Sequence, residues 1–237
     1  MDQGETLREA VRAHYSAKAE APSACCETDL CHKGYQPEAL AALPEGIEMG
    51  LGCGSPTAWA QLRPGEIVVD LGSGGGLDVF LAAQRVGPAG RVIGVDMTKA
   101  MLARAQTSAD RLGLKNVEFR HGLIEALPLD DASADVILSN CVVNLAPDKG
   151  AVFREALRVL KPGGQLVISD MVTLAELPKE IRQDPEMWVS CIGGAIPEKD
   201  YLEAIRIAGF AGVEILERNG LERGPVYSVT VRATKPR

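Results

Sequence analysis

Short, almost continuously apolar segments alternate with amphipathic segments through the middle of the chain. The run Ile67–Leu71 is typical of a strand that is buried on both faces of a parallel sheet. The segments between such runs carry the spacing of helices with one apolar face. The pattern predicts strands over 67–71, 91–96, 117–121, 135–140 and 165–170, and helices over 78–83, 99–112 and 151–160.

Strands that alternate with helices predict βαβ units and an α/β fold with a Rossmann-like, doubly wound, mostly parallel sheet. The flanking regions fit this alternation less well, with a helix expected over 6–14, a helix over 199–208 and closing strands over 213–216 and 227–231. We therefore expect an N-terminal cysteine-bearing region (1–66), a Rossmann-like domain (67–172) and a C-terminal region (173–237). Both flanking regions are expected to cover the edge of the sheet where ligands bind.

Composition and charge narrow the classes of function. The chain has 237 residues, of which 46% are hydrophobic and 24% charged, as in globular proteins. A net charge of -7 argues against nucleic acid as a partner, because such binding needs a basic surface. No apolar stretch approaches the roughly 18 residues of a membrane span, and the first residues lack the pattern of a signal peptide. We expect no membrane partner and a cytoplasmic location.

A glycine-rich loop, Asp70-Leu71-Gly72-Ser73-Gly74-Gly75-Gly76, connects the first predicted strand to a helix. Glycines let the backbone turn tightly and approach a ligand, and the helix N-terminus offers free N–H donors. A dinucleotide fingerprint needs a third glycine where Leu77 stands. The spacing instead resembles the loop of S-adenosylmethionine methyltransferases, which predicts cofactor contacts by Asp70, Gly72, Ser73, Gly74 and Gly76. The alternative is a glycine-rich turn without a ligand.

Residues at the ends of the later strands complete the expected cofactor site. Asp96 ends the second strand, where a carboxylate can accept both ribose hydroxyls. Met97 can lay its thioether against the adenine face. The Ile124 backbone or Glu125 would meet the adenine edge, and Asn140 ends the fourth strand, where methyltransferases often place a catalytic or methionine-contacting group. An ordinary strand-ending Asp96 and a surface Glu125 are the alternatives.

Three of the six cysteines lie in segments marked by glycine or asparagine: Cys53, Cys141 and Cys191. They are far apart in the sequence, so only the fold can bring them together. If they meet at the reactive end of the cofactor, they form a soft trithiolate pocket that favours a thiophilic ion. The alternative is that they are separate buried cysteines that act as small hydrophobic residues.

Several segments together resemble the arsenite methyltransferase family, over about residues 20 to 220. The glycine loop alone would indicate only a methyltransferase, whereas the Asn-Cys-Val-x-Asn-Leu and Cys-x-Gly-Gly-Ala elements are much more selective. The segments that carry the resemblance, besides the glycine loop, are Gly52-Cys53-Gly54-Ser55-Pro56, Asp96-Met97-Thr98-Lys99, Ser139-Asn140-Cys141-Val142-Val143-Asn144-Leu145 and Cys191-Ile192-Gly193-Gly194-Ala195.

The resemblance implies S-adenosylmethionine as cofactor and trivalent arsenic bound by the thiolates of Cys53, Cys141 and Cys191. The substrate would be arsenite or its thiol conjugates, and both flanking regions would add to the arsenic site. The resemblance also implies a fourth, N-terminal cysteine that forms a disulfide with Cys53 during turnover. Cys25 or Cys26 is the best candidate. Thioredoxin or glutathione would then act as the thiol reductant.

The N-terminal cluster also has other interpretations. Cys25, Cys26, Cys31 and His32 could form a zinc site, but adjacent cysteines and a CxxxxC interval are not the usual ligand spacing. A redox or arsenic-capturing role and an inert segment are the other possibilities.

Arsenite methylation also agrees with the residue chemistry. Trivalent arsenic bound by thiolates keeps a lone pair that can attack a sulfonium methyl group, so no general base is needed. This fits a chain with three histidines and no obvious catalytic dyad. The competing hypotheses are a small-molecule C- or O-methyltransferase and a non-catalytic metalloid-binding protein.

Overall fold

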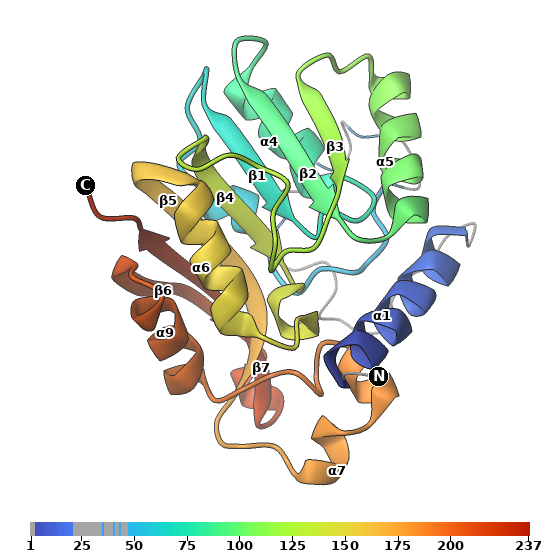
Figure 1. The fold of residues 1–237 in the computed structure, drawn as a ribbon, viewed down its shortest axis with the longest axis vertical. Helices are drawn as coiled ribbons and strands as arrows, with labels where there is room; N and C mark the ends of the chain where they lie inside the picture. Colours follow the sequence, from blue (N-terminus) through green and yellow to red (C-terminus); the bar gives the residue numbers. More distant parts are fainter. Residues whose placement is uncertain (1–2, 21–34, 36–39, 41–42, 44–46) are drawn as a thin grey trace.

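A seven-stranded sheet in the order β3-β2-β1-β4-β5-β7-β6 forms the centre of the computed structural model, which describes residues 3–20, 35, 40, 43 and 47–237 (Figure 1). Strands β1 to β5 pair in parallel, whereas β7 is antiparallel to both β5 and β6. The predicted Rossmann-like, mostly parallel sheet is thus confirmed. The strands are β1 (Ile67–Leu71), β2 (Arg91–Asp96), β3 (Val117–His121), β4 (Ala134–Asn140), β5 (Leu160–Thr173), β6 (Ala211–Asn219) and β7 (Val226–Thr234).

Alternate residues of the parallel strands supply two separate cores. Val68 packs in the core that includes Phe80, whereas its neighbour Val69 packs in the core that includes Phe153 and Tyr201. Burial on both faces explains why these strands are continuously apolar in sequence. Helices α3 (Pro56–Trp59), α4 (Leu77–Val86) and α5 (Lys99–Leu112) belong to the first face, and α6 (Lys149–Val159) and α9 (Glu198–Ile207) to the second.

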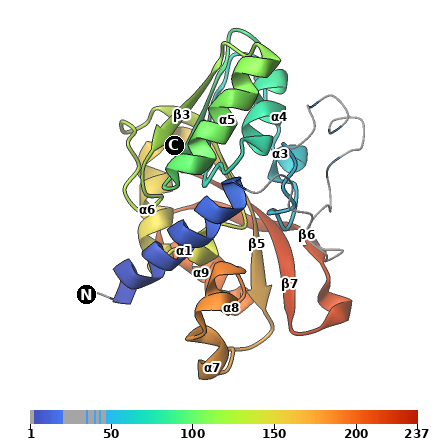
Figure 2. The same ribbon diagram turned by 90° about the vertical axis from the view of Figure 1, so that its right-hand side faces the viewer.

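The strand order reverses beside β1, which pairs with β2 on one side and β4 on the other. Ligands of open α/β sheets bind beyond the carboxyl ends of the strands at such a point. Helix α1 (Gln3–Glu20) crosses this end of the molecule and contacts α5 and α8 (Pro185–Val189), as Figures 1 and 2 show. The N-terminal helix therefore covers the edge of the sheet where a ligand is expected.

Several predicted boundaries were wrong. The first helix is longer than the predicted 6–14, and β5 starts five residues before the predicted 165. Pro162-Gly163-Gly164 lies inside β5, where the Gly163 N–H donates to the Lys235 carbonyl oxygen (2.9 Å) and keeps this segment paired. The predicted closing strands are confirmed, and both are longer; they extend the same sheet through β5.

Short helices were not predicted. They are α3, α8, α7 (Lys179–Arg182) and the 3-10 turns η1 (Val143–Leu145) and η2 (Leu221–Arg223). For α8 a signal was present, because Asp184 caps the helix by accepting from the Glu186 and Met187 N–H groups and Pro185 follows at the first position. Within the described residues, no helix is both long and apolar enough to cross a membrane.

Candidate active site

Two adjoining pockets lie at the carboxyl edge, and both are lined by residues of the glycine loop. They have volumes of about 700 Å³ and about 570 Å³ and share Leu51, Gly72, Gly74 and Asn140. The first is also lined by residues of α1, by Asp96 to Thr98 and by Gly122 to Glu125. The second is also lined by Asp70, Ser73 and Asp78. Together they form one elongated site that passes over the loop.

Almost all residues predicted for the cofactor line these pockets. The first pocket contains Asp96, Met97, Ile124 and Glu125, the second contains Asp70 and Ser73, and both contain Gly72, Gly74 and Asn140. Gly76 lines neither pocket. It precedes α4 with a φ of 92°, and a Cβ there would come within 2.7 Å of the Phe80 ring. Glycine at this position therefore allows the turn into α4 and the close packing against Phe80.

Gly72 and Gly74 of the glycine loop both have positive φ, but only Gly74 faces open space. Gly72 has a φ of 64°, and a Cβ on it would overlap the Val142 side chain. Gly74 has a φ of 49°, and a Cβ on it would meet no protein atom within 4 Å. Because Gly74 lines both pockets, any side chain at this position would occupy the space left for a ligand.

Asp96 fixes the loop and faces the first pocket. Its Oδ2 accepts from the Gly74 N–H (2.9 Å) and its Oδ1 from the Thr98 N–H (2.7 Å). Burial raises the pKa of Asp96, while these two hydrogen bonds act to lower it. The Thr98 side chain also interacts with this carboxylate. These contacts fix the orientation of the carboxylate at the first pocket.

Helix α1 is tied over the first pocket by an ion pair that the sequence did not suggest. The Nε and Nη2 atoms of Arg8 donate to Glu125 Oε1 at 3.2 and 3.1 Å. The carboxylate of Glu125, predicted to meet an adenine edge, is therefore already paired with a guanidinium. Val11 and Tyr15 of the same helix also line the pocket.

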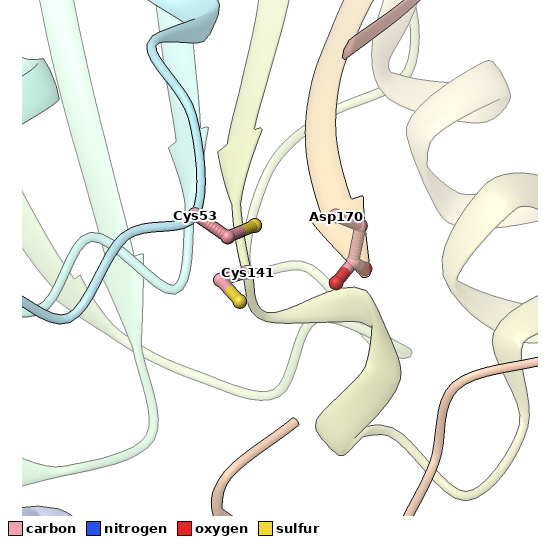
Figure 3. A group of neighbouring side chains, drawn as sticks. All are labelled: Cys53, Cys141 and Asp170. Carbon is pink, nitrogen blue, oxygen red and sulfur yellow. The ribbon is translucent and has the colours of Figure 1, made fainter. Parts of the chain in front are cut away.

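The three cysteines that the sequence singles out, Cys53, Cys141 and Cys191, are free and buried, and they lie in one cluster. The sulfur atoms of Cys53 and Cys141 and a carboxylate oxygen of Asp170 all lie within 4.8 Å of one another (Figure 3). The Cys191 thiol donates to the carbonyl oxygen of Cys141 at 2.8 Å. Cys141 also lines the first pocket, so the thiols adjoin it.

The segment that carries Cys53 lies directly against β4 and β5. The Cys53 N–H donates to Asn140 Oδ1 (3.0 Å), and Asn140 Nδ2 donates to the Gly54 carbonyl oxygen (2.8 Å). A Cβ on Gly52 would come within 2.7 Å of Asn140 Nδ2, and one on Gly54 within 2.6 Å of Ser169 Cβ. The two glycines therefore allow the approach that brings Cys53 to the site, and Asn140 holds it there.

Cys141 and Cys191 adopt left-handed backbone conformations, with φ of 59° and 65°. Among the described residues only one other non-glycine residue, Ala132, has a positive φ. Such conformations cost about 1–2 kcal/mol each for an L-residue and concentrate at functional sites. The strain at two of the three cysteines favours a functional role over simple core packing.

The glycines after Cys191 permit a second close approach. A Cβ on Gly194 would overlap the Asn144 carbonyl oxygen, and one on Gly193 would come within 2.8 Å of the Trp188 backbone nitrogen. Asn144 is in the turn that follows Cys141. The two selective sequence elements thus pack on each other, which places Cys191 beside Cys141.

We expect Gly194→Ala to destabilise the fold by about 3 kcal/mol, since the added methyl group must displace a buried backbone carbonyl. Chemical denaturation would measure the change. The matched control is Gly65→Ala, where φ is 87° but a Cβ meets nothing within 4 Å. It should cost only about 1 kcal/mol from backbone strain. Equal effects of the two substitutions would show that close packing at Gly194 is not important.

The three thiols are expected to be protonated at neutral pH. Burial raises the pKa of Cys53. Contact with Cys191 lowers the pKa of Cys141, but contact with Cys53 and burial together raise it well above its ordinary value. The pKa of Cys191 is also raised well above its ordinary value. Contact with Cys141 is the larger cause and burial the second. The cluster therefore carries little charge until a ligand replaces the thiol protons.

Asp170 is buried and Lys149 half-buried beside the thiols, and sequence reasoning assigned no role to either. Burial raises the pKa of Asp170 to about 6, and burial lowers the pKa of Lys149 to about 8. Each interacts favourably with the charge of the other, so both are mainly ionised at neutral pH. The sequence predicted Asp170 as the last residue of an ordinary strand, whereas β5 continues to Thr173 and Asp170 lies inside it.

Aromatic residues close the other side of the cluster. The Tyr15 hydroxyl donates to the Val189 carbonyl oxygen (3.2 Å) and lies beside the Cys191 thiol. Trp188 donates from Nε1 to the Leu145 carbonyl oxygen (3.2 Å), and the Lys149 ammonium group lies 5.8 Å from its ring centre. Helices α1 and α8 thereby shield the thiols from solvent. Cys25, Cys26, Cys31 and His32 lie outside the described residues.

Comparison with known proteins agrees with the class that the sheet and the glycine loop define, the Rossmann-like methyltransferases. Residues 62–215 match the family described as "Methyltransferase domain". The chain is 35% identical to the crystal structure of an arsenic(III) S-adenosylmethionine methyltransferase from Chlamydomonas reinhardtii, with a TM-score of 0.70. This match covers 96% of this chain and 74% of that one. The chain belongs to the arsenite methyltransferase family.

Curated relatives agree with this membership. The arsenite methyltransferase of Halobacterium salinarum is 43% identical over 91% of this chain and 60% of its own length. That of Aquipseudomonas alcaligenes is 44% identical over 82% of this chain and 58% of its own length. The human arsenite methyltransferase is 42% identical over 64% of this chain and 43% of its own length. The chain thus spans less than two thirds of the length of these relatives.

Proposed function

We propose that this chain transfers methyl groups from S-adenosylmethionine to trivalent arsenic, producing methylated arsenicals as a means of arsenic detoxification. The observation that carries the proposal is the cluster of three free, buried thiols that adjoins the pocket over the glycine loop. Membership of the arsenite methyltransferase family supports it. In this assignment residues 67–172 bind the cofactor, and residues 1–66 and 173–237 add the arsenic-binding parts.

The residues present fit S-adenosylmethionine. The open space above Gly74 is a cradle that a Cβ would fill, and the carboxylate of Asp96 suits the ribose hydroxyl groups. Met97 and Ile124 would enclose the adenine, while Asp70 and Ser73 line the opposite pocket, where the methionine portion would lie. When bound, S-adenosylmethionine supplies an electrophilic methyl group.

The thiol cluster fits trivalent arsenic. Arsenic(III) is soft, so three sulfur ligands suit it better than carboxylates or imidazoles do. Each arsenic–sulfur bond forms as one hydroxide leaves arsenite and takes the thiol proton, giving water. Three neutral thiols and neutral arsenite therefore yield a neutral complex, which suits a buried site where free thiolates are disfavoured.

Cys53, Cys141 and Cys191 would position arsenic so that its lone pair faces the first pocket. The strained backbones of Cys141 and Cys191 and the hydrogen bonds of Asn140 fix the ligands before the substrate binds. Because the nucleophile is a lone pair, no proton must be removed and no general base is required. Alignment of the reacting atoms is then the main contribution of the protein, and such alignment can supply several kcal/mol.

Methylation formally oxidises arsenic, so two electrons must restore the trivalent state. We propose that Cys53 and an N-terminal cysteine, Cys25 or Cys26, provide them by forming a disulfide. Thioredoxin or glutathione would then reduce this disulfide by thiol exchange. Replacing Cys25 and Cys26 in turn, and counting methyl groups transferred per enzyme without added reductant, would identify the cysteine that takes part.

The decisive experiment is to incubate the purified protein with arsenite, a thiol reductant and methyl-labelled S-adenosylmethionine, and to separate the products. The proposal predicts labelled methylarsenicals. Arsenite binding without labelled product, from protein that binds the cofactor, would instead support a metalloid-binding protein. Methyl transfer to a small carbon or oxygen nucleophile in the absence of arsenic turnover would support the other alternative.

The ion pair over the first pocket gives a further prediction. We expect Arg8→Gln to weaken cofactor binding about three- to tenfold, because a partly exposed pair of this kind contributes about 1 kcal/mol to holding α1 in place. Calorimetric titration with S-adenosylmethionine would measure the change. Arg12→Gln, on the same helix but 3.9 Å from its partner Glu5, is the control and should have little effect. Unchanged affinity in Arg8→Gln would refute this role.

A further inference from the structure

Asp170 adds an oxygen donor to the sulfur donors of the thiol cluster. One of its carboxylate oxygens points toward the sulfur atoms of Cys53 and Cys141, as Figure 3 shows, and the three donor atoms lie within 4.8 Å of one another. Cys53 lies in the loop before α3, Cys141 directly follows β4, and Asp170 lies in the C-terminal part of β5; all three are buried. Arsenic(III), with its preference for sulfur, has no need of this carboxylate.

We propose that Cys53, Cys141 and Asp170 form a ligand set for a soft divalent cation such as Zn²⁺ or Cd²⁺, overlapping the proposed arsenic site. The donor types are those of zinc sites, with bonds of about 2.3 Å to sulfur and 2.0–2.2 Å to oxygen. Tetrahedral bonds of these lengths separate the donor atoms by about 3.5–3.8 Å. The donors must therefore approach one another by only about 1 Å.

The carboxylate is already held in the orientation that a ligand needs. Its Oδ1 accepts from Asn144 Nδ2 and from the Met171 N–H, both at 2.9 Å. Its Oδ2 accepts from the Asn144 N–H and the Tyr201 hydroxyl, both at 3.1 Å. These four contacts fill the acceptor positions of both oxygens, so a bound cation would replace one of them, while the remaining contacts keep the direction of the carboxylate.

The charges around the site favour a divalent ion. Two thiolates and one carboxylate supply three negative charges, and the half-buried ammonium group of Lys149, which interacts with Asp170 and Cys191, supplies one positive charge. A cation of charge two then leaves the buried site neutral, which avoids the cost of a net buried charge. The two thiol protons pass to solvent as the cation binds. The thiolates exclude Mg²⁺ and Ca²⁺, which prefer oxygen ligands.

The arsenic and the metal ligand sets differ at one residue each. Arsenic would use Cys191 and not Asp170, whereas the divalent cation would use Asp170 and not Cys191. Because Cys53 and Cys141 are common to both sets, the protein can bind either arsenic or the divalent cation, but not both at once. A soft divalent cation is therefore a competitive inhibitor of arsenite methylation, a consequence that rests on the proposed function.

Cadmium titration, followed by the sulfur-to-metal absorption band, tests the proposal. All proteins carry Ser at positions 25, 26 and 31, so that Cys53, Cys141 and Cys191 are the only thiols. We expect Asp170→Asn to weaken Cd²⁺ binding at least tenfold and arsenite binding no more than about threefold. We expect Cys191→Ser to leave the absorption per bound Cd²⁺ unchanged and to weaken arsenite binding at least 100-fold.

The proposal is overturned if a folded Asp170→Asn variant binds Cd²⁺ as tightly as its parent. It is also overturned if the absorption per bound Cd²⁺ falls by about one third in Cys191→Ser, since three thiolates would then bind the metal. The second criterion decides the question if Asp170→Asn does not fold. These titrations need no methyl donor, so a protein without methyl transfer would contradict the proposed function and not the metal site.

Discussion

Replacing Cys191 by Ser is expected to lower the rate of arsenite methylation by at least 100-fold while cofactor affinity stays within about threefold of the parent. The reason is geometric. Serine offers no soft ligand, so arsenic would be held by two sulfur atoms and its lone pair would no longer be fixed relative to the first pocket. Loss of alignment on this scale costs two orders of magnitude or more. Single-turnover transfer of a labelled methyl group would measure the rate.

The neighbouring residue provides the control for this substitution. Ser190 is exposed and its hydroxyl only donates to the Met187 carbonyl oxygen (2.8 Å), so Ser190→Ala should methylate at the parental rate. Cys191 is 3% exposed and does not line the first pocket, which is why cofactor binding should survive its replacement. If Cys191→Ser lost cofactor binding together with activity, the three cysteines would be packing residues and not arsenic ligands.

Asp96→Ala is expected to weaken S-adenosylmethionine binding about 100-fold. A hydrogen bond to a charged group contributes about 1.5–3 kcal/mol, and the carboxylate would accept from two ribose hydroxyls. It also holds the Gly74 and Thr98 backbone N–H groups in place. Calorimetric titration would give the affinity. Asp110→Ala, an exposed carboxylate at the far end of α5, is the control and should bind the cofactor normally.

A ligand that lacks the ribose 2′-hydroxyl separates the two roles of Asp96. The parent protein should bind S-adenosylhomocysteine at least tenfold more tightly than its 2′-deoxy analogue, whereas Asp96→Ala should not distinguish the two. An equal preference in both proteins would mean that Asp96 only supports the loop and does not contact the ribose.

The sheet was largely predictable because each strand is specified by its own residues. Runs such as Ile67–Leu71 must be apolar to serve two cores, and this requirement is visible without any tertiary information. The long β5 was predicted less well. Its first residues contain Pro162 and two glycines, and they remain in the strand only because residues near the C-terminus pair with them.

The candidate site was predictable where a residue type is unusual for its position. Glycines beside Cys53 and Cys191 marked segments in which two backbones approach closely, and the structure shows these approaches to Asn140 and Asn144. Arg8 and Tyr15 were missed because they are ordinary residues of an amphipathic helix. Their positions depend on how α1 packs across the sheet edge, and no local pattern encodes that packing.

Arsenic K-edge X-ray absorption of the arsenite-loaded protein tests the central claim most directly. The claim is that Cys53, Cys141 and Cys191 together hold trivalent arsenic next to the cofactor pocket. With Ser at positions 25, 26 and 31, the spectrum should show three sulfur neighbours and no oxygen neighbour, and Cys191→Ser should reduce the number of sulfur neighbours to two. Two or fewer sulfur neighbours in the protein with all three cysteines, or three that persist in Cys191→Ser, would contradict the account.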